Sequence, residues 1–406
     1  MLTVATIEES ISIIEEKFKD IELGIEEIDI VNAYGKVIAE DIISDENVPS
    51  FNRSTVDGYA VRSRDTFGAS EGVPSLFSVA GEVKMGEPAE MNVGYGEAVY
   101  VPTGGMVPSN ADSVVMIEYV EAVALNEIMV VRPLAPLENM VIVGEDVKIG
   151  EIIFPKGHVV KPQDMGILAA LGIVKLKVFR EIRIGIISTG DEIVEPDADV
   201  RFGQIRNINS YALVGNCRKD GCTPKLYGII KDDFSLLQKA LKMASEENDI
   251  VLISGGSSVG TKDVTCDAIN SLGEPGVLVH GLQIKPGKPT IIANVDNKAM
   301  FGLPGHPMAA LIIYNVVVKE LIYKLRKQTI KKFGIEAYFS QNYSSDHGRE
   351  EYVMVGLQKK EDKYIAKPVY SKSALIVPMV RADGYVKIEA NKEGILENEK
   401  VEIFLF

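Results

Sequence analysis

The segment Val-Leu-Ile-Ser-Gly-Gly-Ser-Ser-Val-Gly-Thr-Lys-Asp, residues 251–263, joins an apolar strand to a glycine- and serine-rich bend and then to a helical pattern. Gly255, Gly256 and Gly260 let the backbone approach a ligand closely, and the helix that follows adds the positive end of its dipole. Asp263 stands where a metal that bridges phosphates would need a ligand. The bend therefore predicts an anion pocket, although strand-to-helix connections in any α/β protein are also rich in glycine.

The chain around this segment alternates between strand and helix patterns. Apolar strands are predicted over 182–188, 224–230 and 250–254, and amphipathic helices over 209–219 and 233–247. Such βαβ organisation predicts a parallel sheet with helices on both faces. Ligands of these sheets bind at the carboxyl ends of the strands, where the loops 189–192 and 255–258 are expected.

The rest of the chain indicates further domains, as its length of 406 residues also suggests. Thr6 and Glu9 form a capping box before an amphipathic helix. Short alternating runs, such as 97–101 and 128–132, predict a β-rich domain between residues 43 and 157. Further predictions are a short helix over 161–171, an apolar helix over 309–325, and a small C-terminal domain with strands at 351–357 and 385–389.

Composition excludes several classes of protein. A hydrophobic content of 46% and a charged content of 25% are those of a soluble globular protein. Neither a spanning apolar stretch nor a basic leader with an apolar run is present, so a cytoplasmic location is expected. The net charge of −15 argues against nucleic acid or an anionic membrane as the main partner. Cys217, Cys222 and Cys266 support neither a disulfide framework nor a zinc ribbon.

Five clusters could carry chemistry, and each has a plainer alternative. The acids of 189–192 could bind a metal or cap a helix. The two lysines of 284–289 suit an oxyanion, but the segment could also be a solvated turn. The loop 301–308 could be only a helix start, within which His306 is not predicted to be a metal ligand. The segments 49–60 and 101–108 could be no more than structured turns.

The order of these motifs closely resembles the MoeA/gephyrin E-domain family over nearly the whole chain. The matching motifs are Ser-x-x-Asp-Gly-Tyr-Ala at 54–60, Pro-Thr-Gly-Gly at 102–105, Ser-Thr-Gly-Asp-Glu at 188–192, Gly-Gln-Ile-Arg at 203–206, Ser-Gly-Gly-Ser-Ser-Val-Gly at 254–260, Lys-Pro-Gly-Lys-Pro at 285–289 and Leu-Pro-Gly-His-Pro at 303–307. The resemblance implies a multidomain α/β protein. Its expected parts are a molybdopterin-binding βαβ parallel-sheet domain (1–20 and 178–326), a linking domain (21–42 and 147–177), a β-rich lobe (43–146) and a C-terminal β-barrel (327–406).

The family inserts molybdate into adenylylated molybdopterin with release of AMP, assisted by Mg²⁺. By resemblance, the catalytic positions are Asp57, Thr103, Glu192, Asp232, Asp263 and Lys285, of which Glu192, Asp232 and Asp263 are the expected metal ligands. Carboxylates suit a hard cation such as Mg²⁺, and the lysines suit an oxyanion. The expected substrate contacts are Ser254, Gly255, Gly256, Ser257, Ser258, Gly260, Lys288, Pro304, Gly305 and Pro307.

The resemblance also implies an elongated homodimer, with the molybdopterin adenylyltransferase as a candidate protein partner. Departures from the family pattern are Asn52, Val56, Asn207, Gly281 and His306, and tungstate is an alternative to molybdate. Two rival functions are the adenylylating step of the same pathway and a gephyrin-like scaffold. The β-rich lobe and C-terminal domain favour insertion over adenylylation, and the retained acids and Lys285 argue against pure scaffolding.

Overall fold

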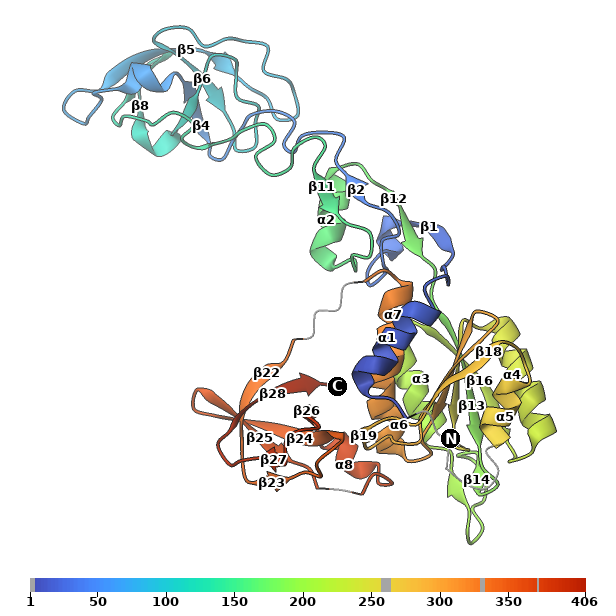
Figure 1. The fold of residues 1–406 in the computed structure, drawn as a ribbon. Helices are drawn as coiled ribbons and strands as arrows, with labels where there is room; N and C mark the ends of the chain where they lie inside the picture. Colours follow the sequence, from blue (N-terminus) through green and yellow to red (C-terminus); the bar gives the residue numbers. More distant parts are fainter. Residues whose placement is uncertain (1–3, 257–263, 329–332, 371) are drawn as a thin grey trace. The chain divides into compact units, whose positions relative to one another are not determined.

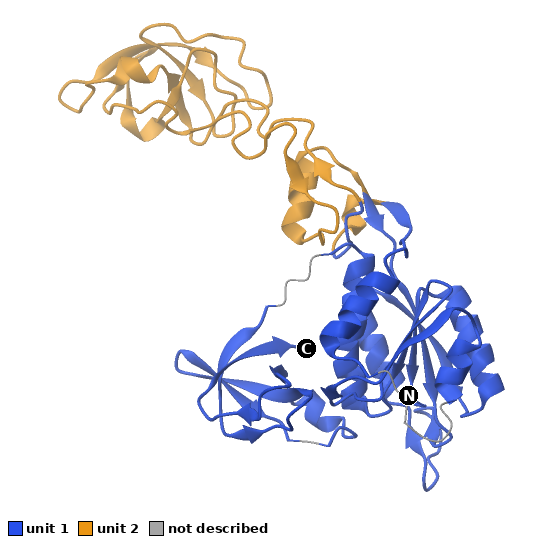
Figure 2. Cartoon of the chain, viewed as in Figure 1, with its two compact units in different colours: residues 1–27, 35–39, 177–406 blue, residues 28–34, 40–176 orange. Residues whose placement is uncertain are grey.

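A computed structural model describes residues 4–256, 264–328, 333–370 and 372–406. The chain divides into two compact units, which Figure 2 shows in different colours. Unit 1 comprises residues 1–27, 35–39 and 177–406, and unit 2 comprises residues 28–34 and 40–176.

The centre of unit 1 is a six-stranded sheet (Figure 1). Its order is β16 (Thr223–Ile230), β13 (Arg183–Thr189), β17 (Ile250–Ser254), β21 (Lys298–Leu303), β20 (Ile291–Val295) and β18 (Pro275–His280). The first four strands are parallel, as the sequence predicts. Strand β20 is antiparallel to both of its neighbours, β21 and β18, which the sequence did not predict. Asp296 and Asn297 adopt positive φ angles of 49° and 63° and close a tight β20–β21 hairpin.

Helices cover both faces of this sheet, as predicted (Figure 1). Along β17 the side chain of Leu252 packs into one core, whereas those of Val251 and Ile253 pack into the other, as the two-residue period of a strand requires. The first core contains residues of α1 (Ile7–Lys17), α3 (Asn209–Lys219), α6 (Pro307–Ile313) and α7 (Lys319–Leu325). The second contains residues of α4 (Phe234–Glu247) and α5 (Val264–Asn270).

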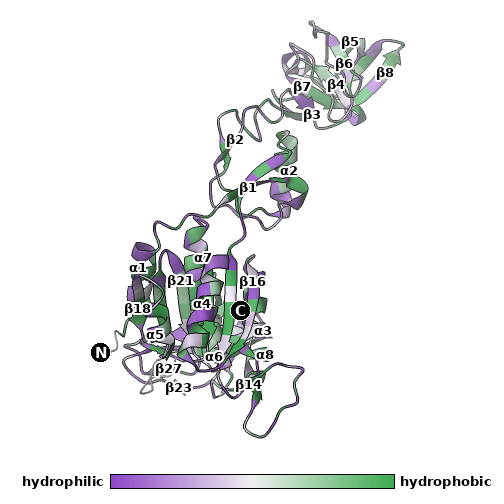
Figure 3. Cartoon of the chain, turned by 90° about the vertical axis from the view of Figure 1, so that its right-hand side faces the viewer, coloured by the Kyte–Doolittle hydropathy of each residue, from purple (hydrophilic) through white to green (hydrophobic). Residues whose placement is uncertain are grey.

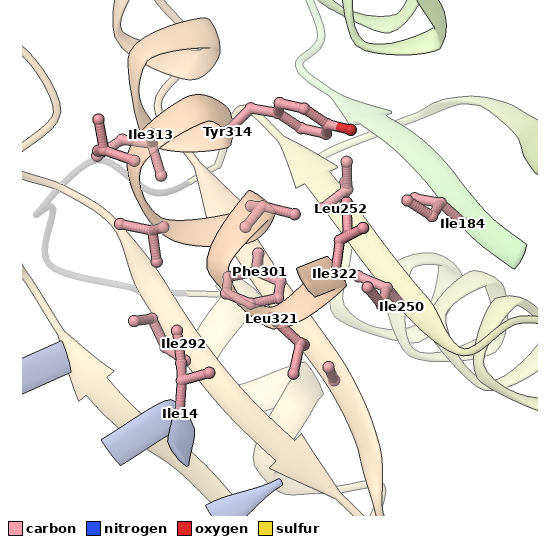
Figure 4. Packing of buried hydrophobic residues seen from close by; sticks show 14 of the residues in the cluster. Ile14, Ile184, Ile250, Leu252, Ile292, Phe301, Ile313, Tyr314, Leu321 and Ile322 are labelled. Atoms are coloured by element: carbon pink, nitrogen blue, oxygen red, sulfur yellow. The ribbon is translucent and has the colours of Figure 1, made fainter. Parts of the chain in front are cut away.

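The larger core shows how the helices are positioned (Figure 4). Ile14 of α1 belongs to the same cluster as Ile292 of β20, and Leu321 of α7 belongs to it with Phe301 of β21. A π-helical turn, Tyr314–Val318, joins α6 to α7. Helix α1 begins at the predicted capping box: Thr6 Oγ1 accepts from the Glu9 amide, and the Glu9 carboxylate accepts from the Thr6 amide.

The helix α4 illustrates why the periodic segments were predictable. Leu237, Leu241 and Ala244 are buried on one side, whereas Lys239 and Lys242 are not buried. The helix accordingly carries polar and apolar stretches (Figure 3). Asp233 caps it by accepting a hydrogen bond of 2.9 Å from the Leu236 amide.

The C-terminal part of unit 1 is a closed five-stranded barrel, which confirms the predicted β-barrel. The strand order β24, β25, β22, β28, β26 returns to β24 through a further β24–β26 pairing. Their bounds are β22 (Ile335–Phe339), β24 (Glu350–Lys360), β25 (Lys363–Pro368), β26 (Gly384–Ile388) and β28 (Lys400–Leu405). A short strand from the sheet domain, β19 (Ile284–Lys285), adds to β24 in parallel. Smaller elements are β23 (Tyr343–Ser344), β27 (Gly394–Ile395) and α8 (Val377–Val380).

Unit 2 contains the predicted β-rich lobe. Its six-stranded sheet has the order β7 (Ser113–Met116), β4 (Gly58–Val61), β6 (Glu97–Val101), β5 (Ser75–Glu82), β9 (Glu127–Val130) and β8 (Val120–Ala124). Neighbouring residues of a strand, such as Ala60 and Val61, belong to different cores. The unit also holds the predicted helix, α2 (Pro162–Ala170), and the strand pairs β2 (Ile42–Ile43) with β11 (Ile152–Phe154) and β3 (Arg53–Ser54) with β10 (Met140–Val141). A further pair, β1 (Ile25–Asp29) with β12 (Lys175–Phe179), has residues assigned to each of the two units.

Across the described residues, no helix combines the length and the apolar character that a membrane span requires.

Candidate functional site

The carboxyl edge of the unit 1 sheet brings most of the predicted clusters together. Register places the ends of the parallel strands side by side: Thr189 pairs with Ile230, and Ser254 pairs with both Ser188 and Leu303. The segments 190–192, 231–232, 255–256 and 304–306 follow directly at this edge. Because β20 is antiparallel, it begins there, and the Lys285–Thr290 segment before it joins the same edge. The predicted residues at this edge of unit 1 are therefore Glu192, Asp232, Gly255, Gly256, Lys285 and Lys288.

Gly255 and Gly256 form what we call the glycine floor of this edge. Neither position has room for a side chain. Gly255 has φ +101°, and a Cβ there would lie 2.2 Å from the carbonyl oxygen of Thr189. A Cβ on Gly256, at φ +63°, would lie 2.7 Å from the hydroxyls of both Thr189 and Thr265. Both positions therefore need glycine, and their backbone lies directly against polar side chains. Ser254, the last residue of β17, is buried.

Asn209, which sequence reasoning missed as a site residue, connects two of these loops. It is the first residue of α3, and its Nδ2 donates to Ser254 Oγ (2.7 Å) and to the Gly305 carbonyl (2.8 Å). Its buried Oδ1 has no hydrogen-bond partner among the described residues, and the same holds for Thr189 Oγ1. Buried polar atoms are normally satisfied, so these two are exceptions at the candidate site. In the sequence Asn209 reads only as a residue at a helix start.

Next to Asn209, a second set of buried polar side chains stabilises the edge. Ser188 Oγ donates to Asn207 Oδ1 (3.1 Å) and lies 2.6 Å from Ser210 Oγ. Asn207, which departs from the family pattern, is thus a structural contact between β13 and α3. It holds the start of α3, and with it Asn209, against the sheet.

The acids of the edge gather beyond β13 and β16. Glu192 and Asp232 are exposed. Desolvation, followed by the charges of Asp191 and Glu192, raises the pKa of Asp232. A cation would relieve this mutual repulsion, and carboxylate oxygens are the ligands that a hard metal such as Mg²⁺ prefers. Within the described ranges, no group of three or more acidic, histidine or cysteine side chains has metal-binding geometry.

Lys285 is held by two acids of the C-terminal barrel. Its Nζ lies 3.2 Å from Glu351 Oε1 and 3.2 Å from Asp346 Oδ2. Desolvation lowers the pKa of Lys285, but hydrogen bonds and charges from Glu351 and Asp346 outweigh it and raise the pKa overall. The β19–β24 pairing brings Lys285 directly opposite Glu351. The ammonium is therefore fixed at the edge while its side chain stays 41% exposed.

The two proline-containing loops of the edge are held by backbone and side-chain hydrogen bonds. The Leu282 amide donates to the Lys288 carbonyl (2.8 Å), while Lys288 itself is exposed. Thr290 Oγ1 donates to the Gly287 carbonyl (2.6 Å). In the other loop Pro304 and Pro307 are buried and Gly305 is exposed. His306 Nδ1 lies 2.7 Å from Ser373 Oγ, a second contact with the C-terminal barrel.

Asp57 and Thr103 lie together within unit 2. Oδ1 of Asp57 accepts a hydrogen bond of 2.8 Å from the amide of Thr103. The loops that carry them are tied by backbone bonds between Ser54 and the pair Gly104 and Gly105. Asp57 and Thr103 are both exposed. The two motifs that sequence reasoning treated separately therefore form one loop pair.

Four predicted residues, Ser257, Ser258, Gly260 and Asp263, lie outside the described residues. The three cysteines are buried, and none of them is joined to another by a disulfide. Burial raises the pKa of Cys217 to about 12 and that of Cys222 to about 11, so both thiols stay protonated at neutral pH.

Three family models together match most of the chain. Residues 5–172 match the MoeA N-terminal region (domain I and II), and residues 336–406 match the MoeA C-terminal region (domain IV). Residues 185–324, which contain the sheet and its carboxyl edge, match a family described as "probable molybdopterin binding domain".

Individual relatives match over nearly their whole length. The molybdopterin molybdenumtransferase of Haemophilus influenzae is 32% identical, covering 93% of this chain and 93% of its own. That of Bacillus subtilis is 30% identical over 91% of this chain and 87% of its own. The crystal structure of a molybdopterin biosynthesis MoeA protein from Pyrococcus horikoshii superposes with a TM-score of 0.85 at 32% identity, covering 99% of this chain and 100% of that one. Similarity in sequence, domain content and fold therefore shows that this chain belongs to the MoeA family.

Proposed function

We propose that this protein acts in molybdenum cofactor biosynthesis as a molybdopterin molybdenumtransferase, which inserts molybdate into adenylylated molybdopterin and releases AMP. The family membership supports the reaction class. One observation carries the assignment to a site: glycine backbone, carboxylates and a fixed lysine share the carboxyl edge of one sheet. A pterin phosphate and an oxyanion substrate need this combination of groups.

We assign the glycine floor to the pterin and its phosphates. Gly255 and Gly256 offer close backbone approach, and Ser254 would add a hydroxyl contact. Ser257, Ser258 and Gly260, which lie outside the described residues, are assigned to the same ligand by their place in the motif. The unpartnered Oδ1 of Asn209 can accept a hydrogen bond from a pterin N–H. Pro304, Gly305 and Pro307 would shape the neighbouring wall.

Glu192, Asp232 and Asp263 would hold Mg²⁺, whose charge would stabilise the phosphate oxygens as AMP departs. The protein's own contribution is to keep Glu192 and Asp232 together at the ends of β13 and β16. Lys285 would bind the incoming molybdate, with Lys288 on the same loop. We retain Asp57 and Thr103 as further residues of the reaction, because they match family positions and form one loop pair.

Several finer points belong to the same proposal. The four-part division into linking, β-rich, molybdopterin-binding and barrel domains, a homodimeric assembly and a cytoplasmic location are predictions, and tungstate stays an alternative to molybdate. Light scattering tests the assembly. A stable monomer of 44.3 kDa with full activity would contradict the homodimer.

Substrate choice separates this function from its nearest rival. The protein is offered either adenylylated molybdopterin with molybdate, or molybdopterin with ATP, in both cases with Mg²⁺. We expect AMP from the first mixture, no adenylylated product from the second, and loss of activity in EDTA. Adenylylation in the second mixture would identify an adenylyltransferase, and inactivity in both would favour a scaffold.

A further inference from the structure

One exposed carboxylate at the candidate site contacts two cations. Oδ2 of Asp346 lies 3.2 Å from Lys285 Nζ and 3.3 Å from Arg349 Nη2. All three side chains reach solvent, with exposed fractions of 64% for Asp346, 41% for Lys285 and 39% for Arg349. A negatively charged group thus occupies the position between two positive groups where an oxyanion would be most stable.

Glu351, the other acid that contacts Lys285, is buried and not exposed. The side chain of Glu351 is only 6% exposed. Its carboxylate accepts hydrogen bonds from the Tyr343 hydroxyl (2.9 Å) and from Ser345 Oγ (2.6 Å). These bonds fix Glu351 within the barrel, so Lys285 keeps a partner and a defined position even when Asp346 turns away.

We propose that Asp346 is an intramolecular competitor, whose carboxylate occupies the oxyanion position on Lys285 and Arg349 until molybdate displaces it. This inference rests on the proposed function, in which Lys285 binds molybdate. Exposed ion pairs contribute little free energy, so a doubly charged oxyanion can displace the Asp346 side chain at modest cost. The buried Glu351 is the anchor and the exposed Asp346 is the exchangeable group.

Competition and a purely structural role of Asp346 predict opposite changes in the affinity for molybdate. Removing the Asp346 charge takes one anionic partner away from both Lys285 and Arg349, so molybdate should bind more tightly. If Asp346 instead only orients Lys285 and Arg349, its removal should weaken binding. A general effect of net charge on an acidic protein would appear equally when any other exposed acid is neutralised.

Equilibrium dialysis of the full-length protein against molybdate alone, with metal analysis of both compartments, tests the inference. The proteins compared are wild type, Asp346→Asn, Lys285→Ala, and Asp362→Asn as the matched control. Asp362 is an exposed acid in the turn between β24 and β25. We expect Asp346→Asn to lower the Kd for molybdate about two- to tenfold, the range that two exposed ion pairs contribute together. Asp362→Asn should leave the Kd unchanged, and Lys285→Ala should abolish or strongly weaken binding.

The outcomes separate this inference from the proposed function. Unchanged or weaker binding in Asp346→Asn, with loss in Lys285→Ala, would overturn the competitor alone. Equal tightening in Asp346→Asn and Asp362→Asn would also overturn it in favour of a net-charge effect. Unchanged binding in Lys285→Ala, or no binding by any of the proteins, would overturn both the competitor and the assignment of Lys285 to the oxyanion.

Discussion

Nζ of Lys285 lies 3.2 Å from Oε1 of Glu351, and this contact joins the sheet domain to the C-terminal barrel at the candidate site. The lysine comes from β19, and the buried acid comes from β24, to which β19 is hydrogen-bonded in parallel. The barrel therefore contributes directly to the candidate site. It supplies the groups that fix a cation beside the carboxyl ends of the strands.

Replacing Lys285 by alanine should raise the molybdate requirement far more than it weakens pterin binding, because the glycine floor remains. Hydrogen bonds to charged groups contribute about 1.5–3 kcal/mol, so half-saturation should need about ten- to a hundredfold more molybdate. The measurement is the molybdate dependence of AMP release. Lys242→Ala, on the exposed side of α4, removes the same charge and should change nothing. Superimposable curves for Lys285→Ala and wild type would place the oxyanion site elsewhere.

Glu351→Gln should destabilise the protein, because the variant loses a buried ion pair and one of its acceptor oxygens becomes an amide donor. We expect a loss of about 1.5–3 kcal/mol in the free energy of unfolding. Urea denaturation measures it. Glu389→Gln is the matched control, since Glu389 is 59% exposed and pairs with Lys387 at the surface. Equal effects of the two substitutions would show that the buried pair adds nothing.

Gly255→Ala should both destabilise unit 1 and impair substrate binding. The alanine methyl would meet the Thr189 carbonyl and the residue would also be strained at φ +101°. Backbone strain alone costs about 1–3 kcal/mol. Gly203→Ala provides the control, because Gly203 has φ +91° but no atom within 4 Å of the place that a Cβ would occupy. A loss of stability in Gly255→Ala no greater than in Gly203→Ala would refute the steric argument.

Asp232 gives a prediction about pH. Its raised pKa means that the folded protein disfavours the charged carboxylate, so metal-free protein loses stability as pH rises from the unfolded-state pKa of about 4 through the folded-state pKa. Asp232→Asn should therefore be slightly more stable than wild type at pH 7 and equal to it below pH of about 4. Solvent screening limits the gain to less than about 0.5 kcal/mol.

Thermal unfolding with and without Mg²⁺ tests the assignment of Asp232 to the proposed metal site. Mg²⁺ should stabilise wild type more than Asp232→Asn, because the variant lacks one of the proposed ligands. Asp199→Asn, an exposed acid of the segment between β14 (Ile193–Val194) and β15 (Ile205–Arg206), should respond to Mg²⁺ as wild type does. Identical Mg²⁺ responses in all three proteins would remove Asp232 from the metal site.

Periodic segments were predictable from the sequence. The helix predicted over 209–219 and the strand predicted over 250–254 have those same bounds in α3 and β17. Burial on one or both sides imposes a periodic spacing of apolar residues, which can be recognised in a short stretch of sequence. The grouping of the 189–192 and 255–256 loops also followed, because parallel strands end at a common edge.

The contacts that complete the site could not be predicted in this way. Lys285 and Asp346 are 61 residues apart in the chain, and Asn209 reaches partners 45 and 96 residues away. The pairing of β19 with β24 involves only two residues of β19, too few to show a period. The direction of β20 was likewise not predictable, because β20 resembles a buried strand of any sheet and its antiparallel direction depends on the β20–β21 turn.

The proposed reaction is the exchange of molybdate for AMP on adenylylated molybdopterin. The most direct test supplies purified protein with adenylylated molybdopterin, Mg²⁺ and limiting molybdate, and measures both the AMP released and the molybdenum bound to pterin. We expect AMP release to depend on molybdate, and we expect the two products to appear in equal amounts. Release of AMP that is independent of molybdate, or pterin that stays free of molybdenum, would contradict it.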